Sequence, residues 1–433
     1  MKSITDFLNF FSPIFASQPS FCNFKRLIMG FSGLSGGRAV TEINDSQHWH
    51  KHFSTIYDFL KKAKWSYEAL SQSLLLWFLF YLNTSKRPVF SVDDTKAFKP
   101  HYSKLPGLCW HADHHKLVKT KVKTEAGEEL TATGVVGHRG HCWVVLAALH
   151  NIRPGKWCAF PFKASLFVRQ KHAGENFKTK LQLALEMLNS LYIPQKPLLV
   201  GDNFYGAATF VNQVKADVLS LLKSTAVAYE AAPVLSQRRR GRPQKYGRKV
   251  KLIEELDQPE RLRLHKVEVY GQTEFVELAS FEGLLRGHQR PVKIVLVKGL
   301  RKSNFLLFTN DLDLSLVEMV EHYAARFQIE IAFRELKQEL GTFNYRLRSL
   351  TAILRYVHLS FVAYALLKFL AIQGQIQPQE TAWYHPKGLA SPRRVQQVIS
   401  QKLQAFRIFQ GLAEAGYLRK NTLPKELSQF AAI

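Results

Sequence analysis

The segment YAARFQIEIAFRELK, residues 323–337, combines residue types that can bind a metal ion and grip phosphates. Four of its polar residues would share one face of a helix, within an arc of about 60°. They are Tyr323, Arg326, Glu330 and Lys337. An apolar stripe beside them predicts that the helix packs on a core, so Glu330 lies at the margin of a buried face. That stripe consists of Ile329, Phe333, Leu336 and Leu340.

An ordinary solvated helix with local ion pairs is the alternative interpretation of this segment. Glu330 would then pair with Arg326 or Arg334, and each pair would stabilise the helix by only a few tenths of a kcal/mol. The helix alone does not decide between the two interpretations.

Two aspartates far upstream favour the metal-binding interpretation. Asp94 lies in the strand-like stretch FSVDDTKAF, and Asp202 follows the apolar stretch PLLVG. Because strand ends present side chains toward a cleft, we expect these two carboxylates to converge with Glu330. Carboxylates are the hard oxygen ligands that Mg²⁺ prefers, and two ions about 4 Å apart can assist both the attacking and the leaving oxygen of a phosphoryl transfer. Asp93 is an alternative to Asp94.

The overall charge indicates an anionic partner. The 433 residues carry 60 Lys plus Arg against 34 Asp plus Glu, a formal net charge of +26. Such an excess favours DNA, because cations that neutralise phosphates release counterions. A basic protein that is merely soluble is the alternative. With 46% hydrophobic residues, the chain has the composition of a globular protein rather than a disordered one.

The cysteines and the apolar runs favour a cytoplasmic protein without a membrane span. Four cysteines show neither CxxC pairs nor regular spacing, which indicates neither a zinc module nor a disulfide framework. The apolar runs 74–82 and 359–372 are shorter than the roughly 20 residues of a membrane span, so we predict buried helices there. The amino terminus shows no clear signal peptide.

The order of predicted elements is that of a mixed α/β layer protein. Strands are predicted at 87–98, 131–137, 142–150, 157–168, up to Gly201, and at 217–225, with a helix at 176–191. Alternating segments after about 228 predict an inserted β unit. A helix of about 25 residues then begins at Ser315, which forms a capping box with Glu318, and ends at Gly341.

The spacing Tyr-x2-Arg-x3-Glu-x6-Lys resembles the Tyr-Arg-Glu-Lys signature of DDE transposases from bacterial insertion sequences. VDDT and VGDNFYG stand upstream in the expected order. The resemblance covers about residues 87–350. It implies an RNase H-like core, with the first Asp on the first strand, the second after the fourth strand and the Glu on a late helix. It also implies a β-rich insertion before that helix.

Each functional position carries over to one residue here. The resemblance implies that Asp94, Asp202 and Glu330 are the catalytic residues and ligands of Mg²⁺, for which Mn²⁺ is a possible substitute. Asp94 is preferred to Asp93 because the family motif places Thr directly after the Asp, and Thr95 follows it here. The expected contacts to the transposon end are Tyr323, Arg326, Arg334 and Lys337.

Five segments follow from this comparison. They are a helical DNA-binding region (1–86), the first part of the RNase H-like core (87–227), a β-rich insertion with a basic linker (228–312), the catalytic Glu helix (313–350) and a basic helical C-terminal region (351–433).

The implied function is that of a DNA transposase. Such an enzyme cleaves at the ends of its element and joins the 3′ ends to target DNA by two-metal phosphoryl transfer. Its partners would be the terminal inverted repeats, the target DNA and a second copy of the chain, as a homodimer on paired ends. The alternatives are a catalytically inactive, domesticated DNA-binding protein and a Mg²⁺-dependent RNase H-like nuclease.

Two weaker patterns concern further DNA contacts. Arg240 and Arg242, in the stretch RRRGRPQ, resemble a hook that inserts Arg side chains into a narrow minor groove, and a solvated basic loop is the alternative. Phe305 and Phe308 are possible stacking partners for a flipped base, although a place in the core is the simpler expectation.

Overall fold

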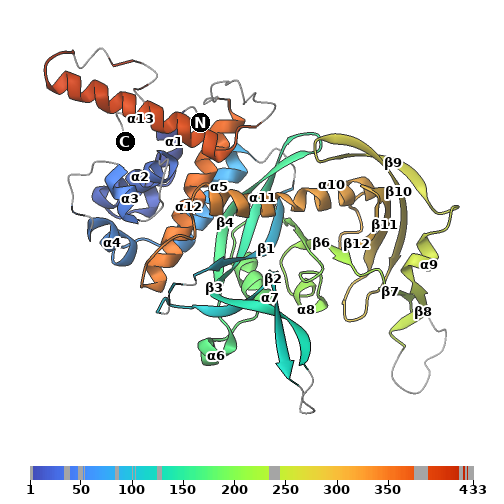
Figure 1. Cartoon of the computed structure of the whole chain (residues 1–433). Coiled ribbons are helices and arrows are strands. Elements are labelled where there is room, and N and C mark those ends of the chain that lie inside the picture. Colours follow the sequence, from blue (N-terminus) through green and yellow to red (C-terminus); the bar gives the residue numbers. More distant parts are fainter. Residues whose placement is uncertain are drawn as a thin grey trace.

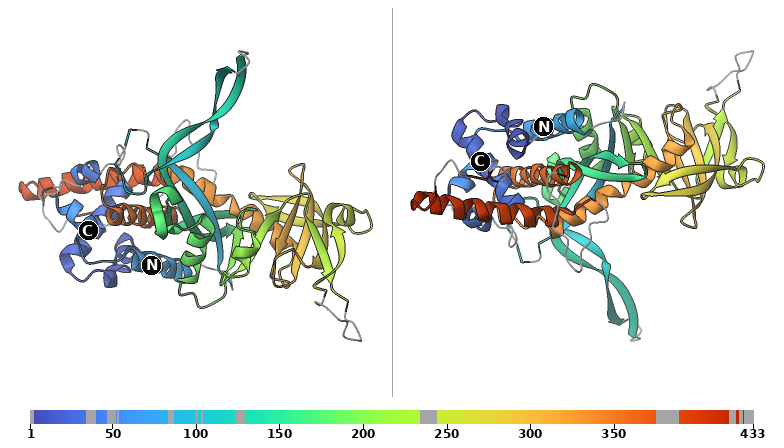
Figure 2. Two further views of the ribbon diagram at one scale, coloured as in Figure 1. Left: turned by 90° about the horizontal axis from the view of Figure 1, so that it is seen from below. Right: turned by 90° about the horizontal axis from the view of Figure 1, so that it is seen from above.

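The computed structural model describes residues 3–33, 40–46, 52, 54–82, 87–99, 101–102, 104–123, 129–233, 244–374, 389–418, 423–424 and 427. They form a helical lobe at one end, a mixed sheet with helices against it in the middle, and further strands at the other end (Figures 1 and 2). The predicted α/β fold class, an RNase H-like mixed sheet flanked by helices, is confirmed.

The central sheet carries the predicted aspartates in β1 and directly after β5. Its first six strands are β1 (Val89–Phe98), β2 (Cys109–Lys123), β3 (Glu129–Arg153), β4 (Lys156–Phe167), β5 (Leu198–Gly201) and β6 (Asp217–Leu222). The core order is β4-β3-β1-β5-β6, with β3 antiparallel to both neighbours and β5 parallel to β1 and β6. Strand β2 pairs only with the first part of β3, and this hairpin projects from the body (Figure 2).

Strand β3 replaces the two strands predicted at 131–137 and 142–150. The glycines within β3 do not interrupt the strand. Gly140 permits a close approach of two backbones, because a Cβ on it would lie 2.7 Å from the carbonyl oxygen of Ala97. Strand β2 was not predicted, since its basic and polar residues lack clear alternation.

Several helices lie beside the sheet, and one of them begins at the predicted cap. They are α6 (Gln170–Ala173), the 3₁₀ turn η2 (Gly174–Asn176), α7 (Lys180–Asn189), α8 (Ala208–Val211), α10 (Leu316–Arg326) and α11 (Gln328–Gln338). The capping box of Ser315 and Glu318 starts α10 as expected. The single helix predicted from Ser315 to Gly341 is in fact two, because α10 ends and α11 begins at Phe327. Gly341, with a φ of +60°, follows α11.

The strands predicted after residue 228 are present and extend the central sheet through β12, which is antiparallel to β6. The elements are β7 (Val227–Ala231), β8 (Tyr246–Lys251), α9 (Leu252–Leu256), β9 (Arg263–Val269), β10 (Gln272–Gly283), β11 (Val292–Leu300) and β12 (Ser303–Thr309). Strands β7 and β8 form a separate two-stranded sheet.

Helices from both ends of the sequence build the helical lobe. They are α1 (Ile4–Asn9), η1 (Ser12–Ile14), α2 (Gln18–Gly33), α3 (Val40–Ser46), α4 (Ser54–Lys61), α5 (Tyr67–Tyr81), α12 (Leu350–Ile372) and α13 (Pro392–Glu414). The Gln396 side chain of α13 donates a 2.7 Å hydrogen bond to the Phe31 carbonyl of α2. Arg355 of α12 donates to the Leu60 carbonyl at 3.2 Å. These bonds join segments about 300 residues or more apart.

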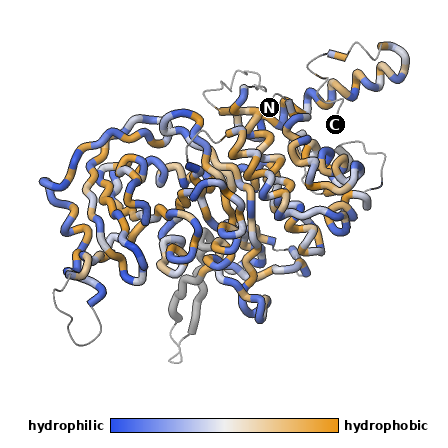
Figure 3. The backbone as a smooth tube through the Cα atoms, turned by 180° about the vertical axis from the view of Figure 1, so that it is seen from behind, coloured by the Kyte–Doolittle hydropathy of each residue, from blue (hydrophilic) through white to orange (hydrophobic). Residues whose placement is uncertain are grey.

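Helix α12 is long and apolar enough to cross a membrane, but 83% of its apolar window is buried inside the fold. It contacts α2, α4, α5, α13 and β4, and Figure 3 shows long hydrophobic stretches in this part of the molecule. The prediction of a buried helix at 359–372 is therefore confirmed.

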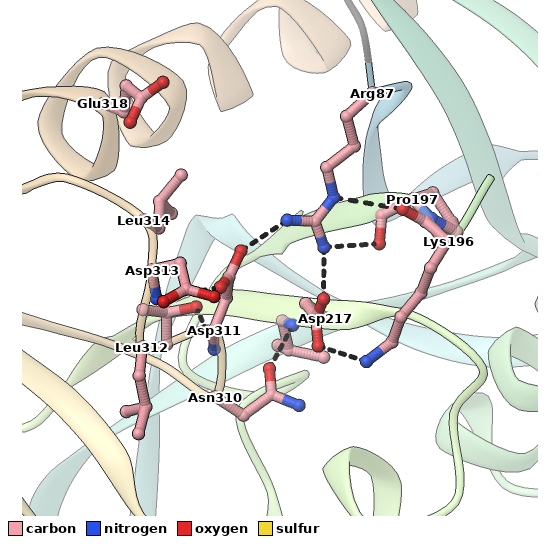
Figure 4. Close-up of polar contacts among 12 residues, drawn as sticks. Arg87, Lys196, Pro197, Asp217, Asn310, Asp311, Leu312, Asp313, Leu314 and Glu318 are labelled. Atoms are coloured by element: carbon pink, nitrogen blue, oxygen red, sulfur yellow. Dashed lines mark hydrogen bonds and ion pairs between the residues drawn. The ribbon is translucent and has the colours of Figure 1, made fainter.

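Arg87 joins the ends of four strands, where β1, β5 and β6 begin and β12 ends (Figure 4). Its guanidinium pairs with Asp217 of β6 and with Asp311, which follows β12. It also donates to the carbonyls of Lys196 at 3.0 Å and Pro197 at 3.3 Å, just before β5. One side chain thus fixes the relative positions of the strands that carry the site at their opposite ends.

Replacing Arg87 by Ala should lower the free energy of unfolding by about 2 kcal/mol, because two carboxylates and two carbonyls lose a charged donor. Urea unfolding at neutral pH measures this change. The control is Lys62→Ala, which breaks an exposed pair with Asp58 and should cost no more than about 0.5 kcal/mol. An equally small loss for the Arg87 variant would contradict the bridging role.

Candidate active site

Asp93 and Asp202 occupy one row across two neighbouring parallel strands. Ser91 of β1 is paired with Val200 of β5, and each aspartate comes two residues later in the chain. Asp202 lies one residue beyond β5, and extending this register by that residue places both aspartates at one level on one face of the sheet. The charge of Asp202 also contributes to the raised pKa of Asp93, as expected for carboxylates that lie close together.

Glu330 approaches this row from the helices that cover the same face. Asp93 is paired with Val145 of β3, so the two side chains lie on the same face of the sheet. His141 and Trp143 precede Val145 by four and two residues and therefore lie on that face as well. Their rings pack against Tyr345 and Phe343, which follow α11, at centroid distances of 5.8 and 6.1 Å. The face that carries Asp93 is therefore the one covered by α11, which holds Glu330, and by the segment after it.

Arg326 joins two of the carboxylates. From the end of α10 its guanidinium contacts Asp93 at 3.3 Å and Glu330 at 2.9 Å. Tyr323 lies one turn earlier, with the Arg326 guanidinium 5.9 Å from its ring centroid. The first part of the predicted polar stripe, from Tyr323 to Glu330, thus persists across the break at Phe327, and Arg326 supplies the positive charge between the two acids.

Asp94 points to the opposite face and has different partners. Its carboxylate accepts a 2.7 Å hydrogen bond from Lys180 of α7 and lies 3.5 Å from the Cys142 thiol. The structure therefore separates the two neighbouring aspartates and brings Asp93, rather than Asp94, together with Glu330. This geometry departs from the preference for Asp94 and favours the alternative that the sequence left open. Lys180 was not predicted, since its only sequence mark is the preceding cap residue Thr179.

Asp202 shapes its own loop. Its Oδ1 accepts hydrogen bonds from the backbone N–H groups of Phe204 and Tyr205, at 3.0 and 3.4 Å. Its carbonyl accepts from the Ser220 hydroxyl of β6 at 2.7 Å. A side-chain turn of this kind holds the carboxylate just beyond the strand end, where it stays close to the row of Asp93.

Asp93, Asp94 and Asp202 lie close enough for their negative charges to affect the same groups. Burial raises the pKa of Asp93 to about 6 against the opposing effect of Arg326, and the negative charges of Asp202 and Asp94 contribute to the rise. Burial also raises the pKa of Tyr205, and the negative charges of Asp94, Asp93 and Asp202 raise it further. The Tyr205 hydroxyl is buried without a hydrogen-bond partner in the described part of the chain. One buried ring thus lies among three carboxylates.

The raised pKa predicts that ionising Asp93 destabilises the metal-free protein. The folded-state value of about 6 exceeds the ordinary 3.8, so the folded protein binds more protons between these values. The contribution to stability is complete below about pH 4 and is lost as the pH rises to about 6. Asp93→Asn should remove this slope and be more stable at neutral pH by up to roughly 3 kcal/mol. Urea unfolding across this range in EDTA measures it; an unchanged slope would contradict the prediction.

Buried contacts on the far side of α11 fix this helix. The predicted apolar stripe of Ile329, Phe333, Leu336 and Leu340 is buried, which confirms that expectation. Behind it, the Glu335 carboxylate accepts hydrogen bonds from Lys368 at 2.9 Å and from the Tyr364 hydroxyl at 2.5 Å, both of α12. These contacts set the rotation of α11 and hence the direction of Glu330.

The other predicted contacts of this helix differ in exposure. Burial lowers the pKa of Lys337, which is half-buried, whereas Arg334 is exposed. Arg240 and Arg242 lie outside the described residues. Phe308 is fully buried, whereas Phe305 is partly buried and packs against Tyr323 at a ring distance of 5.9 Å.

The donor set suits a hard divalent ion, although the side chains are not arranged around one point. Among the described residues, no three His, Cys, Asp or Glu side chains lie close enough to hold a single metal ion. Asp93 and Glu330 instead share the Arg326 guanidinium, a cation between two oxygen donors. Carboxylates that already share one cation fit the chemistry of a Mg²⁺ site.

Comparison with known proteins identifies the family. The sequence matches the DDE superfamily endonuclease family over residues 15–276, more than half of the chain. The chain therefore belongs to the DDE superfamily of endonucleases, enzymes that generally use divalent metal ions. The matched stretch contains Asp93, Asp94 and Asp202 and ends before Glu330.

Among solved structures, the chain is similar to a piggyBac transposase in a synaptic complex with hairpin DNA. The sequences are 8% identical and the TM-score is 0.39, with 96% of this chain and 76% of the other covered. No curated protein matches the sequence.

Proposed function

We propose that this endonuclease is the transposase of a bacterial insertion sequence, from the group with the Tyr-Arg-Glu-Lys signature. It cleaves DNA at the ends of its element and joins the 3′ ends to target DNA. The observation that carries the proposal is the shared row of Asp93 and Asp202 together with the Arg326 link from Asp93 to Glu330. In this proposal Asp93 takes the place first expected for Asp94.

The proposed metal ligands are Asp93, Asp202 and Glu330. Two divalent ions, Mg²⁺ with Mn²⁺ as a substitute, would supply activation of the attacking oxygen and stabilisation of the leaving oxygen when bound there. Without bound ions, Arg326 neutralises Asp93 and Glu330 and keeps them close, which lowers the repulsion between the two carboxylates.

The cationic and aromatic residues beside the acids bind the DNA strand. Tyr323, Arg334 and Lys337 follow Glu330's side of the helices and would hold the phosphates that flank the scissile bond. Lys337 is partly desolvated, so a phosphate that replaces its lost hydration binds it favourably. Catalysis then rests on positioning and charge neutralisation rather than on a covalent protein intermediate.

The biological setting follows from the same proposal. The DNA partners are the terminal inverted repeats and the target, and two copies of the chain assemble on paired ends. The four cysteines are free thiols, as a reducing cytoplasm would keep them.

An assay with purified protein, Mg²⁺ and DNA that carries the repeats flanking the gene tests the proposal. The expected products are strands cut at the element end and joined to a second DNA. Cutting without joining would instead identify a nuclease, and binding alone would identify an inactive DNA-binding protein. Glu330→Gln serves as the control, because it keeps the hydrogen bond to Arg326 possible but removes the charge.

A further inference from the structure

Two tight hairpin turns at the end of the molecule opposite the helical lobe have an unusual composition. Val269 pairs with Gln272 and Leu300 pairs with Ser303, so each turn has two residues at its tip. In both turns the two tip residues have positive φ values: 55° and 78° in one, 48° and 63° in the other. They are Tyr270, Gly271, Arg301 and Lys302. We call these four residues the turn pair.

Side chains are disfavoured at such positions. Two-residue hairpins with positive φ at both tips strongly favour Asn and Gly. Tyr270, Arg301 and Lys302 are the residues other than Gly with positive φ in the described part of the chain. Backbone strain of this kind persists where the side chain has a task that outweighs it, which marks the turn pair as a candidate site.

The two turns meet through their side chains. The Arg301 guanidinium lies 3.4 Å from the centroid of the Tyr270 ring, a close cation–π contact. Arg301 and Lys302 are exposed, and no described carboxylate pairs with either side chain. The ring therefore holds one face of the guanidinium, while its N–H edges stay open to an anion.

The turn pair lies beyond the same strand ends of the sheet as the candidate active site. β12 pairs Leu306 with Leu222 at the end of β6, and β6 runs parallel to β5, whose end leads to Asp202. The tip of the β11–β12 hairpin is thus beyond the same strand ends. Two residues after Ser303, the Phe305 ring packs on Tyr323. An extended strand of DNA could therefore contact the candidate active site and the turn pair at the same time.

We propose that the turn pair is a phosphate-binding site for the DNA that this enzyme acts on. Arg301, held flat against Tyr270, donates to a backbone phosphate, and Lys302 adds a second positive charge. The inference rests on the proposed function, since it names a further part of the same DNA-binding surface. Contacts to phosphate position the duplex without reading its sequence.

Replacing Arg301 and Lys302 by the residues that the turn prefers tests the proposal most sharply. Arg301→Asn with Lys302→Gly should raise the melting temperature, because it relieves the turn, and yet weaken DNA binding. If the contact between Arg301 and Tyr270 serves only stability, the same variant should instead lower the melting temperature and leave DNA binding unchanged. Binding is measured by fluorescence anisotropy without divalent ions, on a labelled duplex that carries one end of the element.

The salt dependence provides a second readout. Arg301→Ala should weaken binding by roughly tenfold at low salt and lower the slope of log K against log salt by about 1, and the Asn-Gly variant should lower it by about 2. Tyr270→Phe should bind as wild type does, because the ring supports the guanidinium. Arg290→Ala, at an exposed arginine outside the turn pair, is the matched control and should change neither quantity.

Wild-type affinity and slope in the Arg301 variants would overturn the inference, as would an equal loss for Arg290→Ala. These outcomes leave the proposed function intact, because cleavage and joining by the wild-type protein are measured separately. Conversely, a wild-type protein that binds DNA through the turn pair but neither cuts nor joins it would refute the proposed function alone.

Discussion

Asp93→Asn should reduce DNA cleavage by roughly a hundredfold or more, whereas Asp94→Asn should retain activity within about tenfold of wild type. Asp93 shares the face of Asp202 and is linked to Glu330 through Arg326. Asp94 is instead held by Lys180 on the opposite face. The two variants differ by one position and make the same chemical change, so each is the control of the other. Initial rates of strand cleavage in Mg²⁺ measure the difference.

DNA binding separates a catalytic role from a general loss of structure. Both variants should bind DNA at least as well as wild type, because the substitution removes a negative charge near the phosphates. If Asp94→Asn is inactive and Asp93→Asn is active, Asp94 is the metal ligand and the preference based on Thr95 was correct. Two active variants would remove this strand from the active site.

Lys368→Ala should lower the free energy of unfolding by about 3 to 5 kcal/mol, because it leaves the Glu335 carboxylate buried without its cation. The side chains of the pair are 8% and 10% exposed, and Tyr364 is the remaining donor to Glu335. Urea unfolding at neutral pH provides the measurement. Since Glu335 belongs to α11, cleavage should fall as well, through a shift of Glu330.

The matched control removes both charges together. Lys368→Met combined with Glu335→Leu replaces the pair by apolar side chains of similar size, which often costs little. This double variant should regain most of the stability that Lys368→Ala loses. If it is as unstable as the single variant, packing around α12 rather than an uncompensated charge causes the loss.

The sequence indicated the fold class and the helix of Glu330 because both depend on local patterns. The capping box at Ser315, the buried stripe beginning at Ile329 and the apolar stretch before Asp202 are all periodic or capping signals. The break at Phe327 escaped prediction, since neither Gly nor Pro marks it. The continuity of β3 escaped as well, because glycines that allow backbones to approach resemble turn glycines in a sequence.

The choice between Asp93 and Asp94 could not be made from the sequence, because it depends on long-range strand pairing. Neighbouring residues of a strand point to opposite faces, so the choice depends on which face the distant helix covers. That information resides in the register of β1 with β5 and β3, which links residues about 50 to 110 positions apart. Lys180 and Tyr205 depend on the same long-range geometry.

The helical lobe also constrains how the polypeptide is made. Its interior combines α2 with α12 and α13, so α2 lacks these two packing partners until more than 300 further residues have been translated. Apolar residues such as Phe24 and Phe31 must remain exposed or transiently covered during that interval. We therefore expect the newly made enzyme to depend on chaperones, and a product truncated before α13 to be recovered mainly as insoluble aggregates.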